Sequence, residues 1–260
     1  MTARDTGARS DADAGLTLEM SIVPWDTDAF GYVVAQIDAI EVRPDRDPRP
    51  VLERLHGWLD DHDVRLVSCR LASLQLRESM LLEQLGFRFI EMVYSPVLSP
   101  LRGDRLETSR VRVDEADEGD RAALEHIAST AFTTGRYHLD WRLDAEAGRR
   151  RYRRWLLSAL ADDGQQVLKA SVGDEIVGFF VLERRPGNTV YWHLTAIAPD
   201  WQGQGIGKEV WRRMIARHAA EGAERIETTI SAHNVPVINL YAGLGFRFTA
   251  PRATYHWLRS

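Results

Sequence analysis

The chain has 260 residues, 44% of them hydrophobic, which is enough for one large or two modest packed domains. Its formal charge of −5 argues against a general nucleic-acid surface, and no apolar stretch approaches the ~20 residues that a bilayer span requires. The single cysteine, Cys69, excludes an internal disulfide framework and a multi-cysteine metal site, so we expect no metal.

The N-terminal residues are polar, carry charges of both signs and lack the apolar core of a signal peptide. We therefore expect residues 1–15 to form a flexible tail, and the protein to be cytoplasmic with neither nucleic acid nor membrane among its partners. Two domains are expected after the tail, at residues 16–100 and 108–260. Proline, glycine and charged residues at positions 99–104 indicate the linker between them.

The first expected domain alternates strand-like and helix-like segments. Strands are predicted at residues 16–23, 32–40, 64–71 and 87–98, and helices at residues 49–61 and 73–85. Ser73 is the expected N-cap of the second helix, and Gly86 is its expected stop. Cys69 falls within an apolar strand, so we expect a buried thiol and not a nucleophile.

The second expected domain opens with a strand at 109–113, a helix at 117–131 and a polar loop through Arg136. A helix at 144–160 and strands at 165–172, 176–183 and 189–198 follow, with hairpin turns at Asp174 and Gly187-Asn188. A glycine-rich stretch, a helix at 208–220, a strand at 225–230, a short helix and a strand at 253–258 complete the chain.

The glycine-rich stretch is Gln202-Gly203-Gln204-Gly205-Ile206-Gly207. It lies between an expected strand and an expected helix, where backbone N–H groups and the helix dipole favour an anionic phosphate chain. The stretch does not fit the dinucleotide pattern G-x-G-x-x-G. It also lacks the spacing of a P-loop, because Lys208 is followed by Glu209 and not by serine or threonine.

The spacing Q-x-x-G-x-G resembles the acyl-CoA pyrophosphate loop of the GNAT N-acetyltransferase superfamily. Asn234, the Leu240-Tyr241 pair and Leu244-Gly245-Phe246 follow in the order and at the spacing typical of that superfamily, so the resemblance covers roughly residues 108–260. It implies an α/β GNAT fold, with a mixed central sheet flanked by helices. It also implies acetyl-CoA as the acyl donor and an amine as the acceptor.

The resemblance further implies that strands 189–198 and 225–230 splay apart around the pantetheine arm of acetyl-CoA. The residues expected to contact acetyl-CoA are Thr195, Ala196, Ile197, Ala198, Gln202, Gly203, Gln204, Gly205, Ile206, Gly207, Lys208, Asn234, Asn239 and Tyr241. For Lys208 the alternative is a solvated helix lysine. For Asn234 the alternative, compatible with binding, is a cap on the helix that follows it.

Two side chains are candidates for the chemistry. Tyr241 stands where the superfamily keeps a tyrosine that protonates the departing thiolate, whose thiol has a pKa near ~8.5; the alternative is that it only packs its helix. His193 is a candidate general base, with a structural histidine, a water chain or an already neutral amine as alternatives. Strict strand alternation predicts that Tyr191, His193 and Thr195 share one face.

The first half resembles part of a second GNAT unit. Leu85-Gly86-Phe87-Arg88-Phe89 repeats as Leu244-Gly245-Phe246-Arg247-Phe248; the alternative is that helix–glycine–strand junctions often look alike. Trp25-Asp26-Thr27-Asp28-Ala29-Phe30-Gly31 is similar to the W-D-x-x-F-F-G start of the TDP-fucosamine acetyltransferase family, with alanine at position 29 where that family has phenylalanine. We therefore expect an N-terminal partial GNAT-like half without a glycine loop.

The same family resemblance implies a nucleotide-linked amino sugar as acceptor and a pocket for it between the halves. Arg136, Tyr137 and His138 would lie along that pocket, with the arginine on a diphosphate and the tyrosine stacked on a base. An ordinary solvated loop is the alternative for this segment.

The leading hypothesis is an N-acyltransferase that moves an acetyl group from acetyl-CoA to the primary amine of a small molecule. The alternatives are a peptide or protein N-acetyltransferase and a CoA-binding regulatory module without turnover. The expected partners are acetyl-CoA and a small-molecule amine, and a homodimer is left open.

Overall fold

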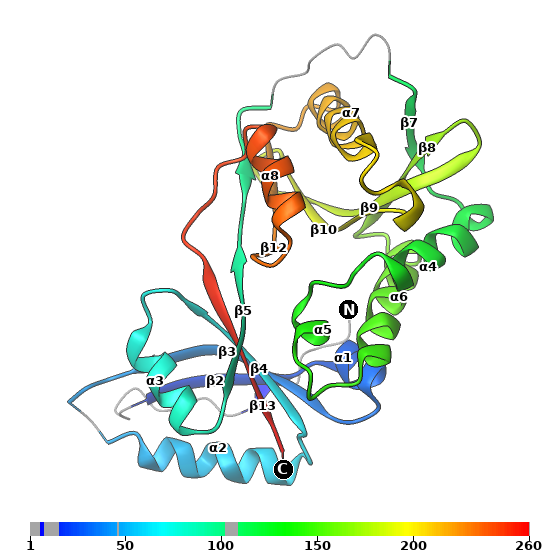
Figure 1. Cartoon of the computed structure of the whole chain (residues 1–260). Helices are drawn as coiled ribbons and strands as arrows, with labels where there is room; N and C mark the ends of the chain where they lie inside the picture. Colours follow the sequence, from blue (N-terminus) through cyan, green and yellow to red (C-terminus); the bar gives the residue numbers. More distant parts are fainter. Residues whose placement is uncertain (1–5, 8–15, 46, 102–108, 260) are drawn as a thin grey trace. The chain divides into compact units, whose positions relative to one another are not determined.

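The computed structural model describes residues 6–7, 16–45, 47–101 and 109–259. The expected tail, apart from residues 6–7, and residues 102–104 of the expected linker lie outside this part. The chain divides into two compact units, drawn in Figure 1. Unit 1 holds the chain up to Val93 together with residues 139–143 and 250–260, and unit 2 holds residues 94–138 and 144–249.

Unit 1 is built on a mixed sheet. Its strands are β1 (Thr6–Gly7), β2 (Leu16–Ile22), β3 (Val34–Val42), β4 (Leu66–Ala72), β5 (Arg88–Tyr94) and β13 (Arg252–Leu258). Its helices are α1 (Pro24–Phe30), α2 (Arg49–Asp61) and α3 (Leu76–Gln84). The strand order is β1-β2-β3-β4-β13-β5, in which only the β3–β4 pair is parallel.

The expected second domain and unit 2 differ at the C-terminus. The sequence places the last strand in the second domain, whereas β13 belongs to unit 1 because it is hydrogen-bonded between β4 and β5. A single strand inserted between two others cannot be recognised from local pattern, since its partners are more than a hundred residues away.

Side-chain patterning explains the core of unit 1 and two departures from expectation. Helix α2 buries Val51, Leu55 and Leu59 at helical spacing against the sheet. Helix α3 begins at Leu76, so the prediction that Ser73 is its N-cap is wrong. Helix α1 has only seven residues, too few for a periodic signal, and it ends at a left-handed glycine, Gly31.

Unit 2 contains a second mixed sheet. Six strands build this sheet: β6 (Val97–Leu98), β7 (Val111–Glu115), β8 (Gln166–Val172), β9 (Glu175–Arg185), β10 (Thr189–Ile197) and β11 (Arg225–Thr228). A short strand of unit 2, β12 (Ile230–Ser231), is not part of it. Its helices are α4 (Arg121–Thr130), α5 (Arg136–Leu139), α6 (Ala145–Leu160), α7 (Ile206–Ala220) and α8 (Val235–Gly243), with 3-10 turns η1 (Glu118–Asp120) and η2 (Pro199–Trp201). The sheet order is β6-β11-β10-β9-β8-β7, and the β10–β11 pair is parallel.

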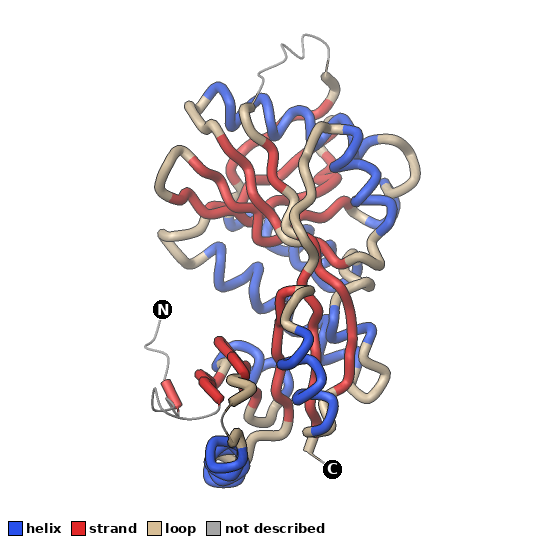
Figure 2. Tube along the Cα trace, turned by 90° about the vertical axis from the view of Figure 1, so that its left-hand side faces the viewer, coloured by secondary structure: helices blue, strands red, loops and turns tan. Residues whose placement is uncertain are grey.

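Helices cover both faces of this sheet, as the tube in Figure 2 shows. Helices α7 and α8 pack on one face through a cluster that contains Phe180 and Trp192. Helices α4 and α6 pack on the other face through a cluster that contains Phe179 and Leu194. The expected fold class, a mixed α/β sheet flanked by helices, is confirmed.

A β-bulge interrupts β10. The register against β9 shifts between Trp192 and Leu194, so His193 is the extra residue. Trp192 belongs to the α7/α8 face, whereas Leu194 belongs to the α4/α6 face. The prediction that Tyr191, His193 and Thr195 share one face is therefore wrong, because the bulge turns Thr195 toward Tyr241 on the α7/α8 side.

Candidate active site

The glycine-rich stretch forms an open turn that leads into α7. Gly203 and Gly205 have φ of 75° and 78°, and nothing lies within 4 Å of the position where a side chain would begin. The backbone conformation, and not crowding, therefore requires glycine here. Two amide side chains brace the turn: Gln202 Nε2 donates to the Ile197 carbonyl (2.9 Å), and Gln204 Nε2 donates to the Asp200 carbonyl (2.5 Å).

Gly205 is the N-cap of α7, so the turn ends on the positive end of a helix dipole. The protein acceptors found among the described residues leave the N–H groups of residues 203–207 without a partner. Lys208 is exposed on the first turn of the same helix. Open N–H groups, a helix N-terminus and a lysine suit an anionic diphosphate.

The two central strands part beside this turn. The parallel pairing of β10 with β11 runs from Thr189–Arg225 to Trp192–Thr228 and then stops, while β10 continues to Ile197 against β9. At the point of divergence the Thr228 hydroxyl donates to the Trp192 carbonyl (2.9 Å). The edge of β10 from residue 193 to 197, which includes Thr195 to Ile197, thus lacks a strand partner on the β11 side, and Ala198 follows with its N–H on the Val177 carbonyl.

Tyr241 lies on α8 under this divergence. Its side chain is 1% exposed, and its ring packs among the rings of Trp192, Trp211 and Phe246. Burial raises the pKa of the Tyr241 phenol, and the neighbouring side chains of Thr195, Trp211 and Thr228 work against that rise. The phenol therefore stays protonated and faces the hydroxyls that flank the gap between β10 and β11, while its ring also packs the helix.

The two asparagines of this region differ in setting. Asn234 is the N-cap of α8, and its side chain accepts from the Val237 N–H at 3.4 Å. Asn239 is exposed on the same helix. The capping role expected as one option for Asn234 is thus present.

His193 lies on the opposite side of the sheet, facing α6. Its ring is 4.8 Å from that of Tyr191 and 5.9 Å from that of Trp155, and its Nε2 is 3.0 Å from Glu183 Oε2. Burial lowers the pKa of His193, and Glu183 opposes that effect. A neutral imidazole with an oriented partner is the form that a general base requires.

Arg136, Tyr137 and His138 form the start of α5 and do not make an open loop. The guanidinium groups of Arg136 and Arg151 lie 4.6 and 5.2 Å from the centre of the Tyr137 ring, and the ring is buried. The expectation that Tyr137 stacks on a base therefore does not fit, since its ring is already covered.

His138 rests on α6 in the place that Gly148 leaves open. A Cβ at position 148 would lie 2.9 Å from Cε1 of the His138 ring. Burial lowers the pKa of His138, with Arg149 adding to the effect, and the ring nitrogens have no hydrogen-bond partner within the described chain.

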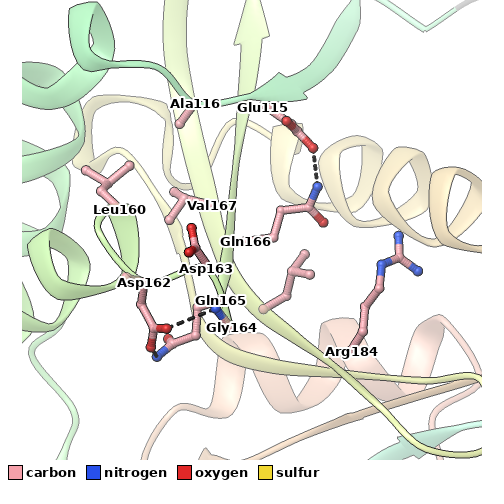
Figure 3. Close-up of a pocket in the computed structure, with 12 residues that line it drawn as sticks. Glu115, Ala116, Leu160, Asp162, Asp163, Gly164, Gln165, Gln166, Val167 and Arg184 are labelled. Carbon is pink, nitrogen blue, oxygen red and sulfur yellow. Dashed lines mark hydrogen bonds between the residues drawn. The ribbon is translucent and has the colours of Figure 1, made fainter. Parts of the chain in front are cut away.

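Unit 2 also has two surface hollows. A cavity of about 650 Å³ opens where α6 ends and β8 begins, shown in Figure 3. Within it Asp162 accepts from the Gly164 N–H and from the Gln165 side chain, and none of the predicted site residues lines it. A second hollow of about 750 Å³ is rich in carboxylates and reaches Ala198, beside the glycine turn.

Unit 1 repeats the strand and helix order of this site without its opening. In both units an antiparallel strand pair is followed by a helix, a parallel strand and a second helix. The repeated Leu-Gly-Phe ends both second helices with the same bonds, and Phe87 N donates to Leu82 O where Phe246 N donates to Tyr241 O. Leu82 thus occupies in unit 1 the position that Tyr241 occupies in unit 2.

Side chains of unit 1 also fill its own strand divergence. The β3–β4 pairing stops at Ile37–Cys69. Beyond it, Gln75 donates to the Ile40 carbonyl (3.1 Å) and accepts from the Ala72 N–H (2.9 Å), and Glu78 accepts from the Val42 N–H (2.9 Å). In unit 1, the backbone groups that a ligand would pair with are thus already hydrogen-bonded to side chains of the same unit.

In unit 2 a sheet opens next to a glycine turn, with a buried tyrosine below the opening, and this is the arrangement expected of a GNAT fold. Residues 122–246 match the acetyltransferase (GNAT) family. The chain therefore carries a GNAT acetyltransferase domain, the domain of GNAT-type N-acetyltransferases, which generally use acetyl-CoA as the acyl donor.

Two known proteins similar to this chain carry different descriptions. The chain is 24% identical over 141 residues to the spore coat polysaccharide biosynthesis protein SpsD of Bacillus subtilis. This match covers 54% of this chain and 48% of that protein. It is 31% identical over 83 residues to an L-2,4-diaminobutyric acid acetyltransferase of Methylotuvimicrobium alcaliphilum, covering 31% and 48%. The chain thus spans about half the length of these curated relatives.

A solved tandem GNAT protein from the clavulanic acid biosynthesis pathway shares the fold. Its TM-score is 0.57 at 14% identity, and the match covers 96% of this chain and 85% of that one. At this identity the likeness concerns the fold alone, and it agrees with two sheets of related topology. Among the described helices, none is both long and apolar enough to span a membrane. Nor do the described residues bring together three or more side chains that could hold a metal.

Proposed function

We propose that this protein is an acetyl-CoA-dependent N-acetyltransferase of a small-molecule amine. The observation that carries the proposal is the opening between β10 and β11, with the glycine turn at its end and the Tyr241 phenol beneath it. Acetyl-CoA would supply the activated acetyl group as a thioester.

Each part of the site has a proposed task. The N–H groups of residues 203–207 and Lys208 bind the diphosphate, and the free edge of β10 from Thr195 to Ala198 pairs with the pantetheine arm, together with Asn234 and Asn239. A backbone N–H on that edge stabilises the developing oxyanion. Tyr241 donates the proton to the leaving thiolate, and His193 accepts the proton of the amine.

For the acceptor, the finer proposal is a nucleotide-linked amino sugar. The similarity to a spore coat polysaccharide biosynthesis protein supports a sugar, whereas the similarity to a diaminobutyric acid acetyltransferase supports a simple amino acid. We propose Arg136 and His138 as acceptor contacts, since their segment packs on α6, which also carries Trp155 beside His193. Tyr137 is left out because its ring is covered.

The experiment is a thiol-release assay with acetyl-CoA and three sets of amines: nucleotide-linked amino sugars, free amino sugars and diamino acids. Peptides with free N-termini and lysines form the fourth set. Release with a small amine supports the proposal, and release with peptides alone would favour the protein N-acetyltransferase. Calorimetric binding of CoA without release in any set would favour a regulatory module, and absence of CoA binding would refute both.

A further inference from the structure

His193 is held by a carboxylate from the neighbouring strand. Glu183 on β9 stands opposite Tyr191 in the register, which brings its Oε2 to 3.0 Å from His193 Nε2. Arg185 in turn donates to the same oxygen from its Nε (3.1 Å) and from a terminal nitrogen (3.0 Å). The pKa of the Glu183 carboxyl is lowered: burial works against this, but the hydrogen bonds from Arg185 and His193 outweigh it.

The state of Glu183 decides which imidazole nitrogen carries hydrogen. An ionised carboxylate can only accept hydrogen bonds, so His193 Nε2 must be the N–H nitrogen. In the neutral ring the lone pair then belongs to Nδ1.

The bulge gives this pair its position. His193 is the extra residue of β10 and the first one past the last β10–β11 partner, Trp192. The rings of Tyr191 and Trp155 flank the imidazole, and the Tyr191 hydroxyl is fixed to Thr229 at 2.6 Å. The imidazole is therefore fixed in direction at the point where the strands part.

We propose that Glu183 is a positioning residue that fixes His193 as the Nε2–H tautomer, so that Nδ1 is the atom that accepts the proton of the acceptor amine. This inference rests on the proposed function. In the transfer the amine nitrogen bonds to the acetyl carbon as the C–S bond breaks. The amine proton goes to Nδ1, the Tyr241 hydroxyl proton goes to the thiolate, and exchange with water restores both residues.

The charged groups around His193 make the proposal testable, because removing each of them should change the pKa of His193 in a known direction. The groups that face it are Glu183 and Arg185 from β9 and Tyr191 from β10, and Arg151 of α6 lies over the Trp155 ring, 5.0 Å from its centre. Beyond the effect of burial, Glu183 raises the pKa of His193 and Arg185 lowers it. Glu183→Gln should thus lower that pKa, and Arg185→Gln should raise it.

The experiment is nitrogen NMR of histidine-labelled full-length protein, titrated with pH. In the wild type the His193 shifts should report Nε2 protonated and Nδ1 bare. The two variants should move the pKa in opposite directions. Glu224→Gln, which removes the same charge from the exposed partner of Asn188, is the matched control and should leave His193 unchanged.

The kinetic arm uses any amine that the wild type acetylates. The acidic limb of kcat/KM against pH should follow the NMR pKa of each variant, and Glu183→Ala should lower kcat/KM by about tenfold or more. A protonated Nδ1, or shifts of the same sign in both variants, would overturn the proposal, as would an acidic limb that ignores the NMR pKa. If the NMR result holds and no amine is acetylated, Glu183 keeps its orienting role and the proposed reaction is what fails.

Discussion

At the residue scale, Tyr241 packs the core and is also the proposed proton donor, and these two tasks can be separated. Its ring is enclosed by three aromatic rings, so truncation would disturb the core. Tyr241→Phe keeps the ring and removes only the hydroxyl. We expect kcat to fall by about 100-fold with the affinity for CoA nearly unchanged.

Steady-state kinetics and calorimetry on the same preparation check this prediction. Tyr255→Phe in unit 1 is a suitable control, because it also removes a hydroxyl that bonds a side chain, that of Ser79. Equal losses in the two variants would argue for a packing role only.

We expect His218 to make the stability of unit 2 depend on pH. The imidazole is fully buried, its Nε2 accepts from Trp192 Nε1 at 3.1 Å, and burial lowers the pKa of His218 to about 4. The unfolded chain, with a histidine pKa near ~6.5, binds the proton first as pH falls. The free energy of unfolding should therefore drop by roughly 3 kcal/mol between pH 6.5 and pH 4.

Denaturant unfolding at a series of pH values measures this slope. The His218→Gln variant lacks the titrating group and should show a shallower slope over that range. An identical slope in both proteins would assign the acid sensitivity to carboxylates.

Sequence reasoning reached some of these residues and not others. Tyr241 could be predicted because its spacing from the glycine turn is fixed by the superfamily resemblance. Glu183 was missed, although the expected hairpin at Gly187-Asn188 already sets it opposite Tyr191. The contact with His193 depends on the bulge, which no local pattern predicts.

At the scale of elements, β10 depends on a glycine in the strand beside it. A Cβ at Gly178 would lie 2.5 Å from the Ala196 carbonyl, which is a fixed backbone atom. Gly178→Ala should push β10 away at the free edge that we propose for acetyl-CoA. We expect a loss of about 1–3 kcal/mol in stability and a weaker affinity for CoA.

Thermal unfolding and CoA calorimetry test this substitution. Gly57→Ala is the matched control, since that glycine lies within α2 with nothing near its Cβ position, and alanine should stabilise the helix slightly. Unchanged CoA binding in Gly178→Ala would show that the edge of β10 is not the contact.

Element boundaries followed the sequence wherever an apolar period or a glycine marked them. The end of α3 just before Gly86 and the hairpin at Gly187 are examples. Helix α7, by contrast, begins at Ile206, two residues before the expected start at Lys208. The start of α3 departed because Gln75, and not the favoured cap Ser73, precedes the helix; the Gln75 side chain instead reaches β3 and β4.

At the scale of the whole molecule, the two units share a topology but should not share a ligand. Gln75 and Glu78 occupy the divergence in unit 1, and Leu82 replaces the tyrosine. We therefore expect one CoA per chain. Calorimetric stoichiometry checks this, with Gly205→Ala as the companion variant, because a strained turn in unit 2 should reduce all of the binding and leave no second site.

The sequence could predict that the first half is GNAT-like and lacks the glycine turn. It could not show that side chains close the strand divergence of unit 1. Gln75 and Glu78 look like ordinary helix residues until β3 is known to lie beside them. Nor could the sequence predict that residues 139–143 belong to unit 1, because contacts with residues far along the chain decide which unit a segment joins.

Gln75 behaves as a built-in ligand surrogate. Because Gln75 already bonds the backbone at the strand divergence of unit 1, CoA should not stabilise that unit. Unit 2, which carries the proposed CoA site at its strand divergence, should be stabilised by CoA. Adding CoA should accordingly slow amide hydrogen exchange along β10 and the first turn of α7, and leave the rates of β3 and β4 where they were.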